Sequence, residues 1–235
     1  MRSKRHRLRV LIRKLISPIL KWLYIKYTSK QRSYTYKDMS IEIFPGVFPP
    51  RFFHTTHFIL EYLQKQDIGS KSFLEIGAGS GLVSIYAAKQ KAKVTATDIS
   101  EIAIQNVKEN AKSLDLKITV TKSDLFKKIR KKKFEWIVIN PPFYPNNPKN
   151  DPEHAWYCGE NYEYFHNLFE QIGNYMNEKS HIIMVLTDTA PIKQIIYIAG
   201  KNDFIMGVER IKKHLLERSF IFTIKKALQS ENLPK

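Results

Sequence analysis

The residues with the clearest chemistry follow an apolar stretch, Trp136–Ile139, that is predicted to be a strand; they are Asn140, Pro141, Pro142, Phe143 and Tyr144. The Asn140 side-chain oxygen and the Pro141 carbonyl can each accept one N–H of a planar amide or amine. Proline has no N–H and a fixed φ, so this backbone cannot readily turn its carbonyl dipole away. Phe143 can stack on the flat group, and Pro142 and Tyr144 are assigned to substrate contacts. An asparagine after a strand can also simply close a turn.

A glycine-rich turn supplies the second signal. Residues Phe73–Gly81 (FLEIGAGSG) run from an apolar strand into Gly77, Gly79 and Gly81, after which a helix is predicted. Such a turn lets a ligand approach the backbone closely, and in a doubly wound sheet it lies at the edge where ligands bind. The dinucleotide fingerprint G-x-G-x-x-G would place its third glycine at Leu82, so a nucleoside without a pyrophosphate fits better.

Acidic residues end the next strands. Asp98 closes the second predicted strand, and its carboxylate can accept hydrogen bonds from ribose hydroxyls. Ile99 can cover one face of an adenine, and Asp124, after the third strand, can accept from an exocyclic amine. An aspartate after a strand is often only a helix cap, but these residues occur in order at successive strand ends. Together they predict a nucleoside site.

The elements that position these residues alternate between strand and helix. Strands are predicted at 72–77, 93–98, 117–121, 136–139 and 181–187, helices at 82–90, 101–114, 162–177 and 191–199, and a closing strand pair at 204–211 and 219–225. A short strand and turn at 40–48 and a helix at 52–64 precede them. This alternation predicts an α/β fold with parallel βαβ units.

The segment Leu74–Gly81 with Asp98 resembles the cofactor site of class I S-adenosylmethionine-dependent methyltransferases, over roughly residues 40–226. The resemblance implies a doubly wound, mostly parallel, seven-stranded Rossmann-like sheet with a terminal antiparallel strand. It implies S-adenosyl-L-methionine as cofactor, with the glycine turn along its methionine part and Glu75 near its amino group. Asp98 matches the ribose ligand, and Asp124 matches the adenine contact.

Asn140-Pro-Pro-Phe143 is similar to the (Asn/Asp)-Pro-Pro-(Tyr/Phe) motif of methyltransferases that act on planar nitrogens. In such a site Asn140 and Pro141 align the nitrogen and oppose its developing positive charge, so no strong general base is needed. Two segments point to different acceptors. Phe44–Phe48 resembles part of the ribosomal-RNA guanine-N2 enzymes, and Gly159–Phe165 resembles part of the HemK/PrmC-like glutamine enzymes. The chain lacks room for the larger N-terminal domain that either subfamily carries.

The composition is that of a folded, basic protein. Apolar residues make up 43%, and the 39 lysines and arginines against 22 acids give a net charge of +17. The single cysteine, Cys158, excludes an intramolecular disulfide framework and a multi-cysteine zinc site. The histidines show no convergent pattern, so no metal is predicted. The run Lys127–Lys133 is either a solvated loop or a phosphate contact.

Residues 1–35 hold eleven of the basic residues and no acid, with apolar residues at helical spacing. They predict a basic amphipathic helical arm, with the methyltransferase domain at 36–230. Charges interrupt the apolar run, which excludes a secretory signal and a transmembrane helix and favours a cytoplasmic location. The arm either lies on the domain with a solvated basic face or docks on RNA or an anionic membrane surface.

The predicted function is therefore N-methylation of a planar nitrogen in a macromolecule. The acceptor is an RNA or ribosome-associated substrate, or a protein such as a release factor, and the two basic patches favour RNA. The alternative is a non-catalytic module that keeps the cofactor pocket and serves RNA binding or ribosome assembly.

Overall fold

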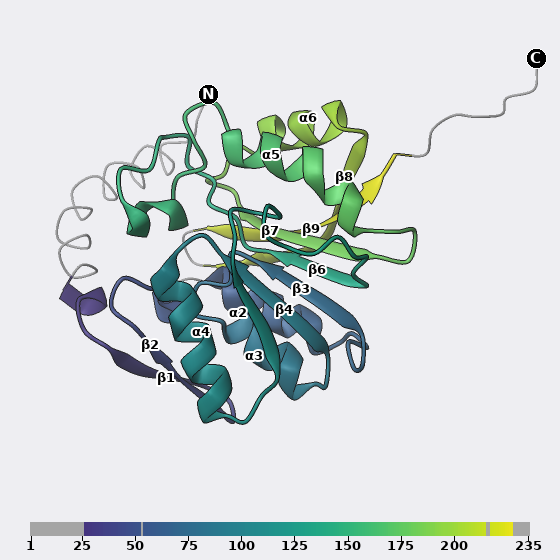
Figure 1. The fold of residues 1–235 in the computed structure, drawn as a ribbon. Coiled ribbons are helices and arrows are strands. Elements are labelled where there is room, and N and C mark those ends of the chain that lie inside the picture. The colour runs from purple at the N-terminus through teal and green to yellow at the C-terminus, as the bar shows by residue number, and fades with distance from the viewer. Residues whose placement is uncertain (1–25, 53, 215–216, 228–235) are drawn as a thin grey trace, which may run out of the picture.

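The computed structural model describes residues 26–52, 54–214 and 217–227, and it builds them around a seven-stranded sheet (Figure 1). Most of the predicted helical arm falls on residues 1–25, outside the described residues. Within the described ranges, no helix combines the length and the apolar character that crossing a bilayer requires.

The sheet has the order β5-β4-β3-β6-β7-β9-β8. Its five parallel strands are β3 (Ser72–Ile76), β4 (Lys93–Asp98), β5 (Ile118–Lys122), β6 (Trp136–Ile139) and β7 (His181–Thr187). The last strand, β9 (Arg218–Lys226), is antiparallel and lies between β7 and the edge strand β8 (Phe204–Lys213). The predicted doubly wound sheet is thus confirmed, and its strand order reverses between β3 and β6.

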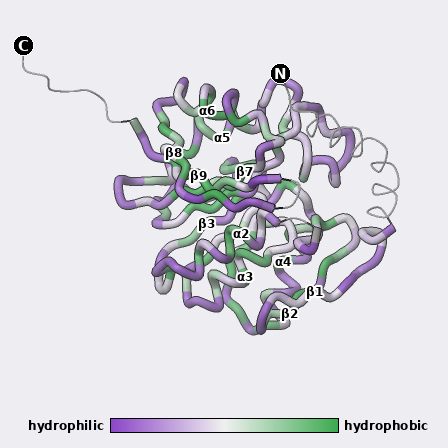
Figure 2. The backbone as a smooth tube through the Cα atoms, turned by 180° about the vertical axis from the view of Figure 1, so that it is seen from behind, coloured by the Kyte–Doolittle hydropathy of each residue, from purple (hydrophilic) through white to green (hydrophobic). Residues whose placement is uncertain are grey.

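Helices cover both faces of the sheet. On one face lie α2 (His54–Leu63), α3 (Leu82–Lys89) and α4 (Glu101–Ser113), and on the other lie α5 (Glu163–Ile172) and α6 (Ile192–Lys201) (Figure 1). Strand residues alternate between the two cores: Phe73 packs toward α2 and α3, and Leu74 packs toward α5 and α6. Because both faces are covered, β6 (WIVI) and most of β7 (HIIMVLT) are continuous apolar runs. The hydrophobic colouring is clear around β7 and β9 in Figure 2.

A two-stranded hairpin, β1 (Arg32–Tyr36) and β2 (Met39–Ile43), lies beside α4. The Asn110 side chain on α4 fixes it, since its oxygen accepts the Glu42 N–H at 2.7 Å and its nitrogen donates to the Glu42 carbonyl at 2.7 Å. The predicted boundary between residues 35 and 36 falls within β1. The sequence of β1, RSYTY, is polar and directly follows the basic region.

Gly81 gives a test of how tightly the glycine turn is packed. Its φ is +77°, and an added Cβ would lie 2.8 Å from Cγ2 of the buried Val107 on α4. We expect Gly81→Ala to lower the free energy of unfolding by roughly 1–3 kcal/mol, measured by urea denaturation. The control is Gly200→Ala on α6, where a Cβ meets open space. It should stabilise the protein by about 1 kcal/mol or less, and equal effects of the two changes would contradict this account.

Candidate active site

The glycine turn and the Asn140-Pro141 corner leave the sheet side by side. Gly77 directly follows β3, Asn140 directly follows β6, and the last residues of these strands, Ile76 and Ile139, are partners in a parallel pair. Neighbouring strands lie about 4.8 Å apart. The adjacency predicted from the sequence is therefore present, at the point where the strand order reverses and ligands bind in folds of this kind.

The glycine turn has free space on its outer side. The Thr97 carbonyl accepts the N–H groups of Gly77 and Ala78, both at 2.9 Å, which holds the start of the turn against β4. Gly77 has a φ of +73°, and a Cβ added to it would meet no atom within 4 Å. A Cβ on Gly79 would meet only the Cβ of Phe48, at 4.0 Å. The turn can therefore lie against a ligand without moving.

Asp98 has a second role besides the predicted one. Its Oδ2 accepts the Gly79 N–H at 2.8 Å, and its Oδ1 accepts the Ser100 N–H at 2.9 Å. Burial raises the pKa of this carboxyl, against the lowering effect of these N–H groups. A carboxylate oxygen can accept more than one hydrogen bond, so Asp98 holds the glycine turn and keeps capacity for a hydroxyl-bearing ligand.

Glu75 lies beneath the turn, facing α3. Its Oε2 accepts the Ser84 N–H at 2.8 Å and a hydrogen bond from the Ser84 hydroxyl. Burial raises the pKa of Glu75 to about 8. These contacts show that Glu75 fixes the first turn of α3. The resemblance also implied that Glu75 contacts the amino group of the cofactor, and that contact stays a prediction.

Asp124 and the basic run are joined by an ion pair. The Lys127 ammonium lies 2.6 Å from Asp124 Oδ2. The rest of the run leads to the N-terminal end of the parallel strands, just before β6. There the Lys133 ammonium donates a hydrogen bond to the Gly173 carbonyl at 3.2 Å. Only the beginning of Lys127–Lys133 is therefore near the site. Ile99, directly after Asp98, is partly buried there.

The Asn-Pro corner presents two oxygens. Asn140 is partly buried, and neither its side-chain amide nor the Pro141 carbonyl has a hydrogen bond to another described residue. Phe143 packs on the core beneath α5, with its ring 4.8 Å from that of Tyr144. Tyr144 is fixed in turn, because its carbonyl accepts the Cys158 N–H at 3.0 Å. The backbone of the corner is thus held in place, and its two oxygens can accept hydrogen bonds from a substrate. Pro142, the next residue, is partly buried.

Asn106 on α4 is a site residue that the sequence analysis missed. Its oxygen accepts the Phe44 N–H at 2.6 Å, and its nitrogen donates to the Ser80 carbonyl at 3.1 Å. It thus joins the segment Phe44–Phe48 to the glycine turn. The Phe48 ring meets the Trp156 ring edge-on at 5.2 Å, which brings the loop after the Asn-Pro corner to the same place. The sequence signal that could have indicated this role is the pair Asn106 and Asn110, two asparagines four residues apart on one face of the predicted helix.

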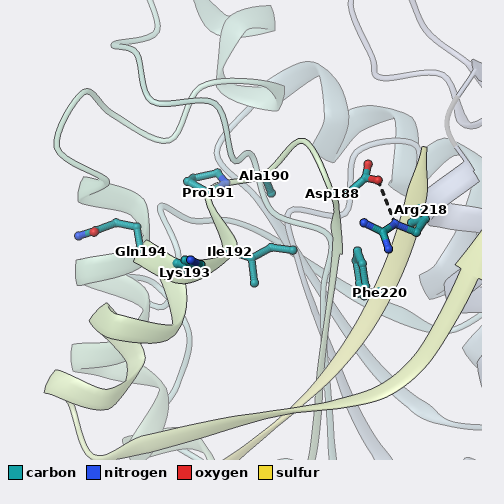
Figure 3. Close-up of a pocket in the computed structure, with 8 residues that line it drawn as sticks. All are labelled: Asp188, Ala190, Pro191, Ile192, Lys193, Gln194, Arg218 and Phe220. Atoms are coloured by element: carbon teal, nitrogen blue, oxygen red, sulfur yellow. Dashed lines mark hydrogen bonds and ion pairs between the residues drawn. The ribbon is translucent and has the colours of Figure 1, made fainter. Parts of the chain in front are cut away.

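An open depression of about 520 Å³ lies farther along the same edge of the sheet (Figure 3). Asp188 follows β7, and its Oδ2 lies 3.2 Å from Nε of Arg218, the first residue of β9. The depression is lined by Asp188, Ala190, Pro191, Ile192, Lys193, Gln194, Arg218 and Phe220. In the strand order it lies on the side of β6 away from the glycine turn.

The remaining side chains that could carry metal or thiol chemistry are the histidines, the carboxylates and Cys158. In the part of the chain that the structure describes, no three His, Cys, Asp or Glu side chains group as metal ligands do. Cys158 is buried, and burial raises the pKa of its thiol to about 11. A neutral, packed thiol at this position fits a structural role.

This strand order, with a glycine turn and an Asn-Pro-Pro-Phe corner at its reversal point, defines the class I methyltransferase fold. Residues 38–208 match the family described as the methyltransferase small domain, and the chain belongs to that family. The resemblance seen in the sequence is thereby confirmed.

The chain is similar both to methyltransferases named for a protein substrate and to methyltransferases named for an RNA substrate. The chain is 32% identical over 118 residues to the release factor glutamine methyltransferase of Bacteroides thetaiotaomicron, covering 48% of this chain and 42% of that protein. It is 35% identical over 115 residues to the ribosomal RNA small subunit methyltransferase C of Buchnera aphidicola, covering 48% of this chain and 33% of that protein.

Among solved structures, the fold is similar to that of the T. thermophilus 16S rRNA N2 methyltransferase in complex with AdoMet and guanosine. The TM-score is 0.62 at 17% identity, over 84% of this chain and 50% of that one. The matches span half or less of the length of each of these three proteins.

The buried Glu75 predicts a pH dependence of stability. Its pKa of about 8 in the folded protein lies above the ordinary 4.5, so between these values the folded protein holds a proton that the unfolded chain releases. The free energy of unfolding should therefore fall as pH rises from about 5 to 8, by at most about 1.4 kcal/mol per pH unit from this group. Glu75→Gln should flatten this slope in urea denaturation series.

The matched control is Glu135→Gln. The Ser72 N–H holds the pKa of Glu135 below its ordinary value, so its stabilising effect is lost only as pH falls. This variant should change the acid end of the stability curve and leave the slope above pH 5 intact. Parallel slopes for wild type and Glu75→Gln would contradict the assignment.

Proposed function

We propose that this protein is an S-adenosylmethionine-dependent N-methyltransferase acting on a planar nitrogen of a macromolecule. The observation that carries the proposal is the position of Asn140. Its amide has no hydrogen bond to the described residues, and it lies one strand away from a glycine turn with open space before it. A hydrogen-bond acceptor held beside a turn that a ligand can approach closely suits this chemistry.

The residues present fit the cofactor. Gly77 and Gly79 leave room along the backbone, Asp98 can accept from ribose hydroxyls, and Asp124 can accept from the adenine amine. Ile99, directly after Asp98, is assigned to one face of the adenine. When bound, S-adenosylmethionine supplies a methyl group on a positively charged sulfur, which needs no further activation. The part left to the protein is to align the acceptor.

The chain's own groups perform that alignment. Asn140 Oδ1 and the Pro141 carbonyl each accept one N–H of the acceptor, which fixes its plane and directs the nitrogen lone pair toward the methyl group. As positive charge develops on the nitrogen, the two fixed carbonyl dipoles stabilise it. Phe143, anchored on the core beneath α5, stacks on the flat group. Pro142 and Tyr144 border it on the acceptor side.

The proposed acceptor is a component of translation, either an RNA base or a protein glutamine, and the proposed location is the cytoplasm. Release factor and ribosomal RNA enzymes are both relatives, and the net charge of +17 favours a phosphate-bearing partner. The depression after β7 adds the basic side chains of Lys193 and Arg218 at the same end of the sheet. Contact of residues 1–35 with an anionic surface stays a prediction.

A non-catalytic module, the alternative function, would need only some of the residues of this site. Such a module needs the glycine turn and Asp98, but it does not need a freely accepting amide beside them. Turnover therefore separates the two functions, because both bind the cofactor and only the enzyme consumes it.

Asn140→Ala tests the proposal directly. We expect it to lower methyl transfer by roughly a hundredfold or more and to leave cofactor affinity within about twofold, since Asn140 acts on the acceptor. The assay incubates the protein with labelled S-adenosylmethionine and separate ribosomal RNA, transfer RNA and protein fractions. The fraction that takes the label identifies the acceptor class.

The matched control is Asn167→Ala, on the exposed surface of α5, which should transfer methyl groups as the wild type does. Equal activity of the Asn140 variant and the wild type would overturn the catalytic assignment. Cofactor binding without label in any fraction would favour the non-catalytic module.

A further inference from the structure

The edge strand β8 carries an exposed apolar surface. It pairs with β9 on one side, and no other described strand lies along its outer edge (Figure 1). Of the six large apolar side chains that are exposed in the described ranges, three lie on β8: Ile205, Val208 and Ile211, each more than half exposed. Two more, Ile196 and Tyr197, lie on α6, which packs against β8. Apolar side chains gathered beside an unpaired strand edge mark an interaction surface.

A β-bulge turns two of these residues to the same face of the sheet. Val208 is opposite Phe222 and Ile211 is opposite Phe220, and both of these β9 residues pack on the core beneath α5 and α6. Residues directly opposite each other share a face, whereas residues three apart on a regular strand point to opposite faces. The bulge adds Glu209 between Val208 and Ile211, so both apolar side chains point to the α6 face.

The two residues between Val208 and Ile211 carry opposite charges. Arg210 lies over the ring of Tyr62 on α2, 5.6 Å from its centroid, and Glu209 is exposed. In the part of the chain that the structure describes, neither charge forms an ion pair. The next charge along the strand is already used, since the Lys212 ammonium lies 2.5 Å from Oε1 of Glu61 on α2. The middle of β8 therefore offers one acidic and one basic group for a new ion pair.

The segment Val208-Glu-Arg-Ile211 is complementary to itself. When it lies antiparallel to the same segment of a second copy, about a twofold axis between Glu209 and Arg210, each Val208 meets the Ile211 of the other copy. Each Glu209 then meets an Arg210. Apolar groups cover apolar groups, and opposite charges lie across from each other. A twofold contact requires this property, because the same patch supplies both sides of it.

We propose that β8 is a dimerisation surface whose partner is a second copy of this chain, paired antiparallel about the Glu209–Arg210 step. An unrelated peptide strand would need the free edge and the apolar residues, but it gives no reason for the symmetric order apolar, acidic, basic, apolar. The pairing occupies the β8 edge of both copies, so the assembly closes at two. Because β7 and β9 lie between β8 and the Asn-Pro corner after β6, the proposal stands independently of the proposed function.

The test is sedimentation velocity of the full chain over a concentration series. About 0.5 M salt screens the repulsion between two molecules of net charge +17. The wild type should show a monomer–dimer equilibrium. Val208→Lys and Ile211→Lys should each raise the dimer dissociation constant by roughly tenfold or more, since a charge would face an apolar side chain. The matched control Ile102→Lys, at an exposed residue of α4, should leave the constant within about twofold.

Charge exchange tests the position of the axis. Glu209→Arg and Arg210→Glu should each weaken the dimer, because like charges then face each other. The double exchange restores opposite charges across the axis and should return the dissociation constant to within about threefold of the wild-type value. Thermal melting of each variant separates loss of pairing from loss of folding. A dimer that the double exchange fails to restore would overturn the twofold pairing.

Two further outcomes would overturn the inference. The first is a wild type that stays monomeric at every concentration, whether or not it binds an added acidic peptide at this edge. The second is a dimer that neither Val208→Lys nor Ile211→Lys weakens. Neither outcome bears on methyl transfer, so the proposed function stands or falls with the Asn140 variant alone.

Discussion

The parallel pairing of β3 with β6 is the constraint on which the site depends. Ile76 and Ile139 are neighbours in this pair, so whatever follows them must leave the sheet at the same point. In the sequence, β4 and β5 come between β3 and β6. In the sheet, β4 and β5 lie on the other side of β3, so that β3 and β6 remain neighbours. A glycine turn and an Asn-Pro corner, more than sixty residues apart in the chain, thereby leave the sheet side by side.

Buried polar side chains then fix the turn from below and from the side. Glu75 holds α3, Asp98 holds the Gly79 N–H, and Asn106 ties the Ser80 carbonyl to the segment Phe44–Phe48. Each of these side chains satisfies backbone groups that would otherwise be unpaired in the interior. A ligand meets a turn whose shape is already set, so little conformational entropy is lost on binding.

The sequence predicted the elements of the central sheet nearly to the residue, because apolar strands and amphipathic helices alternate there with clear turn residues between them. It missed β1, whose Arg32-Ser-Tyr-Thr-Tyr36 pattern is polar and follows a basic region. It also missed the hydrogen bonds of Asn106 and the second role of Asp98. Those contacts join residues distant in sequence, and no local pattern encodes which backbone N–H a buried amide will meet.

The place of β9 has a consequence for synthesis on the ribosome. β9 is the last strand of the described chain, yet it lies inside the sheet, between β7 and β8, and supplies Arg218 and Phe220 to the depression beyond Asn140. Until β9 has been synthesised, the edge of β7 that pairs with it has no partner strand. The depression lined by Arg218 and Phe220 can be completed only after β9 has been synthesised, so its lining depends on the last strand of the described chain.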